Sequence, residues 1–336
     1  KPDTVRLYAI HFIAWSYRGN NPDTAIILAE EQLKLANTQP GLKGKKWTAR
    51  AFNTIGVSYK NKSNYPKALE YDLKALHLSE EVGNKKGVGD CYTNIGLIYF
   101  YQSDYKNALK YDLNALKTLE EIGNKQGMGT AYMNIGSVYT KQADYEKALE
   151  YYLKSIPLME EVEDKHGLAT CYNNIGETYT LHLDYPKALE YFLKALQAKK
   201  LLKAKLGIEI CYGNLGNLFI KLADFKRAKL YSDSCLRLSL EIGDIEGERE
   251  AYNNLAMTYS KTGKYKEAYE SHVKFKQLTD SIFNAENSKQ LGDMKTQFEV
   301  EKKEAELKVK SEAEQEKLKA IASEEKKRQQ VIIYAV

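Results

Sequence analysis

Residues 131–152 read AYMNIGSVYTKQADYEKALEYY, and this arrangement of small and aromatic residues returns every 40 residues along the chain. Three of its positions form series with this spacing. The glycine series is Gly56, Gly96, Gly136, Gly176 and Gly216, completed by Ala256. The aromatic series is Tyr59, Tyr99, Tyr139, Tyr179, Phe219 and Tyr259. The alanine series is Ala68, Ala108, Ala148, Ala188, Ala228 and Ala268. Coincident series of one period indicate an internal repeat of the solenoid type.

Each repeat unit is predicted to be a pair of helices. In residues 87–102, Cys91, Ile95 and Ile98 recur at the spacing of one helix face, which predicts an amphipathic first helix. Asp104 then occupies the position of a helix N-cap. The residues after it again show apolar side chains at the spacing of one helix face, which predicts the second helix. Gly123 supplies a left-handed residue that ends the second helix. The unit is therefore a helix-turn-helix.

Stacking of these pairs explains the composition. A single pair cannot bury its apolar face, whereas stacked pairs bury a continuous core. The 26 tyrosines against nine phenylalanines are accounted for as fillers between the helices, without a cofactor site. Cys91, Cys171 and Cys211 take a position that is alanine in other units, which predicts small core fillers and not disulfides.

The residues quoted above resemble the tetratricopeptide repeat family, through their aromatic, Gly, Tyr and Ala signature. The usual unit of that family has about 34 residues, and the 40-residue period here is similar to its longer-helix variant. The resemblance implies an all-α fold: a right-handed superhelical solenoid of helix-turn-helix repeats, followed here by a long charged helix or coiled coil.

The chain is expected to divide into four parts. Residues 1–46 are interpreted as a degenerate N-terminal cap repeat, and residues 47–286 as six repeats of 40 residues. Residues 287–330 are rich in Glu and Lys and predict a charged helical stalk that can form a coiled coil and a homodimer. Residues 331–336 are apolar and are interpreted as the start of a transmembrane helix.

Charge and motifs argue against several function classes. A net charge of +5 from 50 basic and 45 acidic residues predicts no nucleic-acid partner. The five histidines fall at unrelated repeat positions, which predicts no metal site. Phosphate-binding glycine loops and nucleophile motifs are lacking in the sequence. We therefore expect no cofactor and no enzymatic activity in this chain.

The family resemblance also implies a binding site for a protein or peptide, in a concave groove lined by the first helix of each unit. Carried over residue by residue, it gives an asparagine row, which Thr54 interrupts in the first full unit. The row is Asn94, Asn134, Asn174, Asn214 and Asn254. Flanking candidates are Asn53, Asn173, Asn253, Glu177, Asn217, Tyr101 and Phe100. Amide side chains can bond the main chain of an extended peptide. Alternatively, these amides bond a neighbouring helix and belong to the packing.

The order of the parts further resembles bacterial membrane-anchored sensors, in which a repeat ectodomain, a stalk and one transmembrane helix precede an output domain. In those proteins the output is a histidine kinase, a cyclase or a PP2C-like phosphatase. The resemblance implies a sensor region of a signal transduction protein, anchored by a segment beyond Val336, with a periplasmic or extracytoplasmic repeat domain. The basic residues Lys326 to Arg328 oppose the extracytoplasmic placement, because the positive-inside rule favours a cytoplasmic repeat domain. The alternative is a soluble cytoplasmic scaffold that mediates protein-protein interactions.

Overall fold

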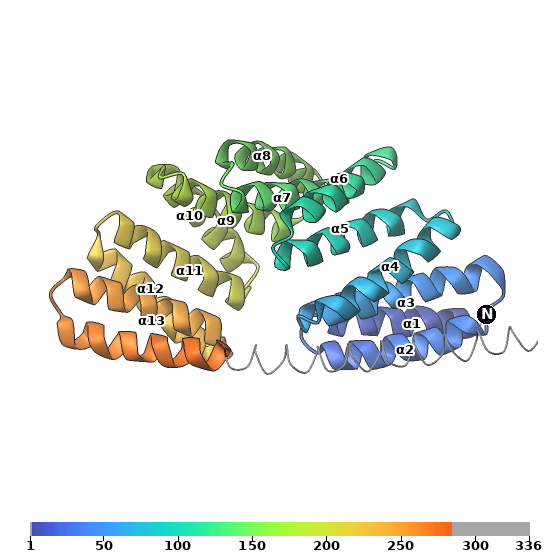
Figure 1. The fold of residues 1–336 in the computed structure, drawn as a ribbon, viewed down its shortest axis with the longest axis horizontal. Coiled ribbons are helices and arrows are strands. Elements are labelled where there is room, and N and C mark those ends of the chain that lie inside the picture. The colour runs from blue at the N-terminus through green and yellow to red at the C-terminus, as the bar shows by residue number, and fades with distance from the viewer. Residues whose placement is uncertain (1, 284–336) are drawn as a thin grey trace, which may run out of the picture. The chain divides into compact units, whose positions relative to one another are not determined.

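The computed structural model describes residues 2–283, and all regular structure within them is α-helical (Figure 1). The first pair is α1 (Pro2–Tyr17) and α2 (Pro22–Asn37). The pairs that follow are α3 (Gly41–Asn61) with α4 (Tyr65–Glu81), α5 (Lys85–Tyr101) with α6 (Tyr105–Glu121), α7 (Lys125–Lys141) with α8 (Tyr145–Glu161), α9 (Lys165–Leu181) with α10 (Tyr185–Leu201), and α11 (Lys205–Lys221) with α12 (Phe225–Ile242). Helix α13 (Ile245–Lys261) is followed by helical residues 265–283. The all-α solenoid is confirmed.

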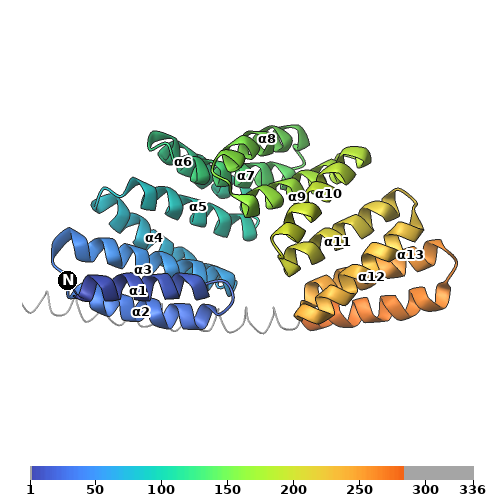
Figure 2. The same cartoon turned by 180° about the vertical axis from the view of Figure 1, so that it is seen from behind.

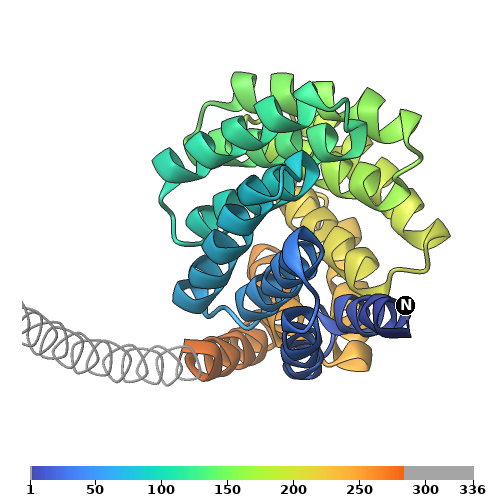
Figure 3. The ribbon, with the colours of Figure 1, turned by 90° about the vertical axis from the view of Figure 1, so that its right-hand side faces the viewer.

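Within the compact unit Lys1–Leu278, the helix pairs stack in chain order (Figures 1 and 2). Each odd-numbered helix contacts the next odd-numbered helix, from α1 to α13. In the described chain, by contrast, no two even-numbered helices are in contact. The odd-numbered helices therefore form the closely spaced inner layer of the stack and the even-numbered helices form the outer layer. Figure 3 shows the same stack of helices from the side.

The predicted helix signals hold in the structure. The side chains of Asp104, Asp144, Asp184 and Asp224 each accept a hydrogen bond from the backbone N–H three residues later. This satisfies one of the amides that every helix start leaves without an intrahelical partner. Gly83 and Gly123 follow the ends of α4 and α6 with φ of 66° and 63°.

The turn within each pair uses a left-handed residue that is mostly not glycine. This position is Ser63, Ser103, Ala143, Leu183, Ala223 and Gly263 in successive units. Ala143, for example, has φ of 60°. A β-carbon in this conformation crowds the following carbonyl oxygen. The stack therefore imposes this turn against local preference.

Each glycine of the 40-residue series lies against a variable residue of the second helix. The partners are Asp72, Asp112, Tyr152, Phe192 and Ser232, which face Gly56, Gly96, Gly136, Gly176 and Gly216 in order. All five are buried. The tyrosines pack as predicted: Tyr99 stacks on Tyr111 with ring centroids 5.4 Å apart. The four cysteines are free and buried.

The N-terminal pair packs on the repeats through Leu7, Ala36 and Trp47, which form one buried cluster. The compact unit that contains the repeats ends at Leu278. The expected stalk at 287–330, its homodimer and the apolar run at 331–336 lie outside the described residues. The four-part division stays a prediction.

The expectation of a membrane-anchored protein requires correction. Among residues 2–283, no helix combines the length and the apolar character that are needed to cross a bilayer. Helix α6, for example, carries Lys106, Lys110, Lys117, Glu120 and Glu121 among its 17 residues, and charged side chains are costly in the hydrocarbon core of a bilayer. The predicted anchor and the extracytoplasmic placement that depended on it are withdrawn.

Candidate functional site

A cavity of about 410 Å³ opens on the inner layer of the stack, across the odd-numbered helices of three successive units. Its walls come mainly from α5, α7 and α9, and α6 and α8 each add one residue. The lining residues are Leu97, Phe100, Tyr101, Asp112, Met133, Asn134, Ser137, Thr140, Lys141, Tyr152, Thr170, Asn174 and Glu177. Apolar and aromatic groups thus lie beside amides, hydroxyls and charged groups, which is typical of ligand sites.

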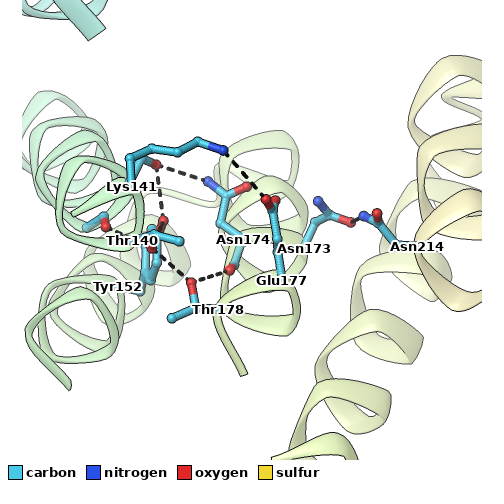
Figure 4. Close-up of polar contacts among 10 residues, drawn as sticks. Thr140, Lys141, Tyr152, Asn173, Asn174, Glu177, Thr178 and Asn214 are labelled. Carbon is cyan, nitrogen blue, oxygen red and sulfur yellow. Dashed lines mark hydrogen bonds and ion pairs between the residues drawn. The ribbon is translucent and has the colours of Figure 1, made fainter. Parts of the chain in front are cut away.

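A hydroxyl network holds the α7 wall of this cavity (Figure 4). The Tyr152 hydroxyl donates to Ser137 Oγ at 3.1 Å and lies 3.3 Å from Thr140 Oγ1. Thr140 Oγ1 is 2.9 Å from Thr178 Oγ1, which donates to the backbone carbonyl of Asn174 at 2.8 Å. Burial raises the pKa of Tyr152 to about 12, so its hydroxyl stays protonated. The network fixes α7, α8 and α9 relative to one another.

Two charged residues pair across the mouth of the cavity. Lys141 Nζ on α7 lies 3.9 Å from Glu177 Oε1 on α9, and both side chains are about half exposed (Figure 4). Solvent screens such a pair, so it contributes little to stability. Both groups remain accessible to a ligand.

Asp112 is the unusual member of the cavity wall. Only 1% of its surface is exposed. Asn134 Nδ2 donates to its Oδ1 at 3.4 Å, whereas Oδ2 has no hydrogen-bond partner. Burial raises the pKa of this carboxyl to about 8, against the opposing effect of Asn134. The group is therefore mostly protonated at neutral pH, because a bare buried carboxylate is costly.

The asparagine row is present on the inner layer, and its amide nitrogens reach toward the preceding unit. Asn174 Nδ2 donates to Ser137 Oγ at 3.5 Å, and Asn214 Nδ2 donates to Asn173 Oδ1 at 3.0 Å (Figure 4). Asn254 Nδ2 donates to the carbonyl of Gly213 at 3.1 Å and is only 1% exposed.

Asn94 lies beside Asp72 and opposes the rise in its pKa that burial causes. Neither carboxyl oxygen of Asp72, however, has a partner that meets hydrogen-bond geometry. Asn94 and Asn254 thus serve neighbouring helices, whereas Asn134 and Asn174 also line the cavity. The packing interpretation thus accounts for Asn94 and Asn254, whereas ligand binding by Asn134 and Asn174 stays a prediction.

The other predicted residues are distributed along the inner layer. Phe100, Tyr101 and Glu177 line the cavity with Asn134 and Asn174. Asn53 lines a second cavity of about 310 Å³ with His11 and Arg50. Asn253 lines a third cavity of about 420 Å³ with Met257 and Tyr269. Asn173 contacts Asn214, and Asn217 is half-buried on α11. The predicted residues therefore lie along the inner layer, and five of them line the same cavity.

The lining residues that are absent from the predicted set include Asp112, Ser137, Thr140, Tyr152 and Thr170. One signal was available for Asp112. It follows Ala108 by four residues on the buried face of its helix, and Asp72 follows Ala68 in the same way. A carboxyl in that register is unexpected in a core.

Two observations on the described residues concern metal binding and thiol reactivity. Residues 2–283 contain no group of three His, Cys, Asp or Glu side chains that could hold a metal ion. Burial raises the pKa of the Cys211 thiol to about 11 and that of Cys171 to about 12. Such thiols are poor nucleophiles at neutral pH. The arrangement suits binding.

The fold defines a class: a helical repeat protein built from stacked helix pairs. Models of the tetratricopeptide repeat match residues 47–121, 127–200, 211–241 and 249–270, which together make up more than half of the chain. The chain belongs to the tetratricopeptide repeat family. Comparison with curated proteins gives no match.

Solved structures share the fold at low sequence identity. Apo RapI is 17% identical, with a TM-score of 0.62 over 83% of this chain and 99% of RapI. A signal transduction ATPase from Pyrococcus horikoshii with a tetratricopeptide repeat sensor is 18% identical, with a TM-score of 0.64 over 83% of this chain and 43% of that one. NprR in complex with its cognate peptide NprX is 19% identical, with a TM-score of 0.57 over 80% and 78%. These similarities establish the fold alone.

Proposed function

We propose that this chain is a protein-interaction module that binds an extended peptide, or an extended segment of a partner protein, in the cavity across α5, α7 and α9. The observation that carries the proposal is the composition of this cavity. Asn134 on α7 and Asn174 on α9, which lie one repeat unit apart, offer amide groups to the cavity. Phe100, Tyr101 and Met133 offer apolar contacts beside them. Amides can satisfy a peptide main chain while apolar walls select its side chains.

Two further features support this proposal. NprR, which has the same fold, was solved with a cognate peptide bound. The hydroxyl network of Thr140, Tyr152 and Thr178 also makes the cavity wall rigid before a ligand arrives, which lowers the entropy cost of binding. We propose no catalytic step for this chain. A scaffold that brings partner proteins together is the role that fits this site best.

The test begins with selection of binding peptides from a random display library on the intact chain. A photoreactive amino acid is then introduced at Met133 in the cavity or, as the control, at Leu153, which is 49% exposed on the outer helix α8. The selected peptides should cross-link from position 133 and not from position 153. Failure to select any peptide, or cross-linking only from position 153, would overturn the proposal.

A further inference from the structure

Two carboxyl groups occupy equivalent positions in successive units and differ in their surroundings. Asp72 and Asp112 are 0% and 1% exposed, and each lies against the glycine of its own unit. Both have carboxyl oxygens without a hydrogen-bond partner. Asp112 lines the cavity across α5, α7 and α9, whereas Asp72 does not line it. A buried carboxyl group without a hydrogen-bond partner destabilises the fold. Because Asp112 lines a cavity, a bound ligand could supply the partner that it lacks.

The charges around this cavity leave one acid without a counter-ion. The titratable groups that line it with Asp112 are Tyr101 from α5, Lys141 from α7, Tyr152 from α8 and Glu177 from α9. Lys141 already lies 3.9 Å from Glu177. The Tyr152 hydroxyl donates to Ser137. Asp112 Oδ2 is therefore buried at the cavity wall without a hydrogen-bond partner, and Lys141, the cation of the lining, pairs with Glu177 instead.

The apolar and aromatic side chains near Asp112 can pack against the aliphatic part of a lysine or arginine side chain. Phe100, Tyr101, Leu97 and Met133 line the same cavity, and Tyr101 is 54% exposed. Lysine and arginine bury their aliphatic stems along such surfaces. Their charged heads are attracted to aromatic faces, with a larger effect when water is excluded.

We infer that this cavity accepts a cationic side chain, a guanidinium or an ammonium group of the bound peptide, which pairs with Asp112 while its stem packs on Phe100, Tyr101 and Met133. The inference rests on the proposed peptide binding and adds a specificity determinant to it. A charge-assisted hydrogen bond to the free carboxyl oxygen would supply the partner that the unbound chain lacks.

The pairing couples binding to a proton. The carboxyl of free Asp112 is protonated near neutral pH, because burial raises its pKa to about 8. A cation beside it favours the ionised form, so binding releases one proton to solvent. The affinity for a basic ligand should therefore rise by up to about tenfold per pH unit below pH ~8 and level off above it.

The probes are capped pentapeptides with two glycines on each side of a central arginine, lysine, norleucine or glutamate. Binding is measured on the intact chain from the chemical shifts of the Met133 methyl and the Asn134 and Asn174 side-chain amides. We expect the arginine and lysine probes to bind about tenfold or more tightly than the norleucine probe, and the glutamate probe to bind most weakly. Asp112→Asn should remove this preference and its pH dependence.

Asp72→Asn is the matched control, because it removes an equally buried acid that does not line the cavity. It should leave the preference for arginine intact. Equal binding of the four probes, or a preference unchanged by Asp112→Asn, would overturn the inference. If display-selected peptides cross-link from position 133 but tolerate replacement of every basic residue, the peptide-binding proposal stands and the cation inference fails. If no peptide is selected, the proposal fails, and the arginine probe still decides the inference by itself.

Discussion

The ring of Tyr152 occupies the space in which a β-carbon on Gly136 would lie. A β-carbon built there would be 2.7 Å from Tyr152 Cε1. The ring cannot move aside easily, because it is 1% exposed and its hydroxyl bonds Ser137 and lies against Thr140. This contact sets how closely α7 approaches α8.

Gly136→Ala should therefore reduce the free energy of unfolding by about 1–3 kcal/mol through overpacking. Gly213→Ala is the control, because its β-carbon would meet no atom nearer than 3.5 Å. The control should gain about 0.5–1 kcal/mol from its higher helix propensity. Urea denaturation followed by circular dichroism measures both; equal midpoints for the two variants would contradict the packing account.

Ala143 occupies the left-handed turn between α7 and α8, with φ of 60°. Glycine adopts this conformation without steric cost, so Ala143→Gly should stabilise the chain by about 1 kcal/mol. Gly263, at the equivalent position, has φ of 75°. Gly263→Ala should cause a loss of similar size. Thermal denaturation of the two variants tests the idea, which is refuted if both shift the melting temperature in the same direction.

Asn254 and Asn174 share a repeat position but should differ in their effect on stability. Asn254 is 1% exposed and donates to Gly213 O at 3.1 Å, whereas Asn174 is half-buried with a longer contact of 3.5 Å to Ser137. Asn254→Ala removes this buried hydrogen bond and leaves a space in its place, and it should lower the free energy of unfolding by about 1–3 kcal/mol. Asn174→Ala should cost less than about 1 kcal/mol. Chemical denaturation of the two single variants makes the comparison, and a larger loss at Asn174 would reverse the assignment.

Asp112 should make the chain less stable as pH rises. Its pKa is about 8 in the folded chain, against about 3.9 when unfolded. Between these values the folded state holds a proton that the unfolded state has lost, so stability falls as pH rises from about 4 to about 8 and is constant above. Asp112→Asn removes this dependence. The asparagine variant should gain up to about 1.4 kcal/mol on the wild type for each pH unit between about pH 5 and about pH 8.

Denaturant midpoints of the wild type and Asp112→Asn across that pH range give the measurement. Asp104→Asn is the control, because Asp104 is an exposed N-cap whose pKa is lowered by the hydrogen bond from the backbone of Asn107. Asparagine also caps helices well. A gap between wild type and Asp112→Asn that stays constant with pH would show that the carboxyl does not titrate in this range.

The fold was predictable because its determinants recur at fixed spacing. Gly136 and its equivalents mark the close approach of two helices, Asp144 and its equivalents mark helix starts, and neither depends on distant sequence. The left-handed turns were not predictable in the same way, since Ala143 and Leu183 carry no local preference for that conformation.

The site was predictable only in part, because each asparagine responds to the residue it meets in the preceding unit. Asn214 meets Asn173 and bonds its side chain, whereas Asn254 meets Gly213, which has no side chain, and bonds its carbonyl instead. Asp112 belongs to the outer layer by sequence and reaches the cavity only because Gly96 leaves room for it. The repeat period does not contain this information.

The most direct test of the central claim is the affinity of a display-selected peptide for the double variant Asn134→Ala, Asn174→Ala, measured by isothermal titration calorimetry. If these amides bind the peptide main chain, affinity should fall by about tenfold or more, with the melting temperature within a few degrees of the wild type. Asn254→Ala serves as the control and should lose stability while binding the peptide as before. Unchanged affinity in the double variant, or a loss that follows the melting temperature alone, would show that these asparagines only pack the repeats.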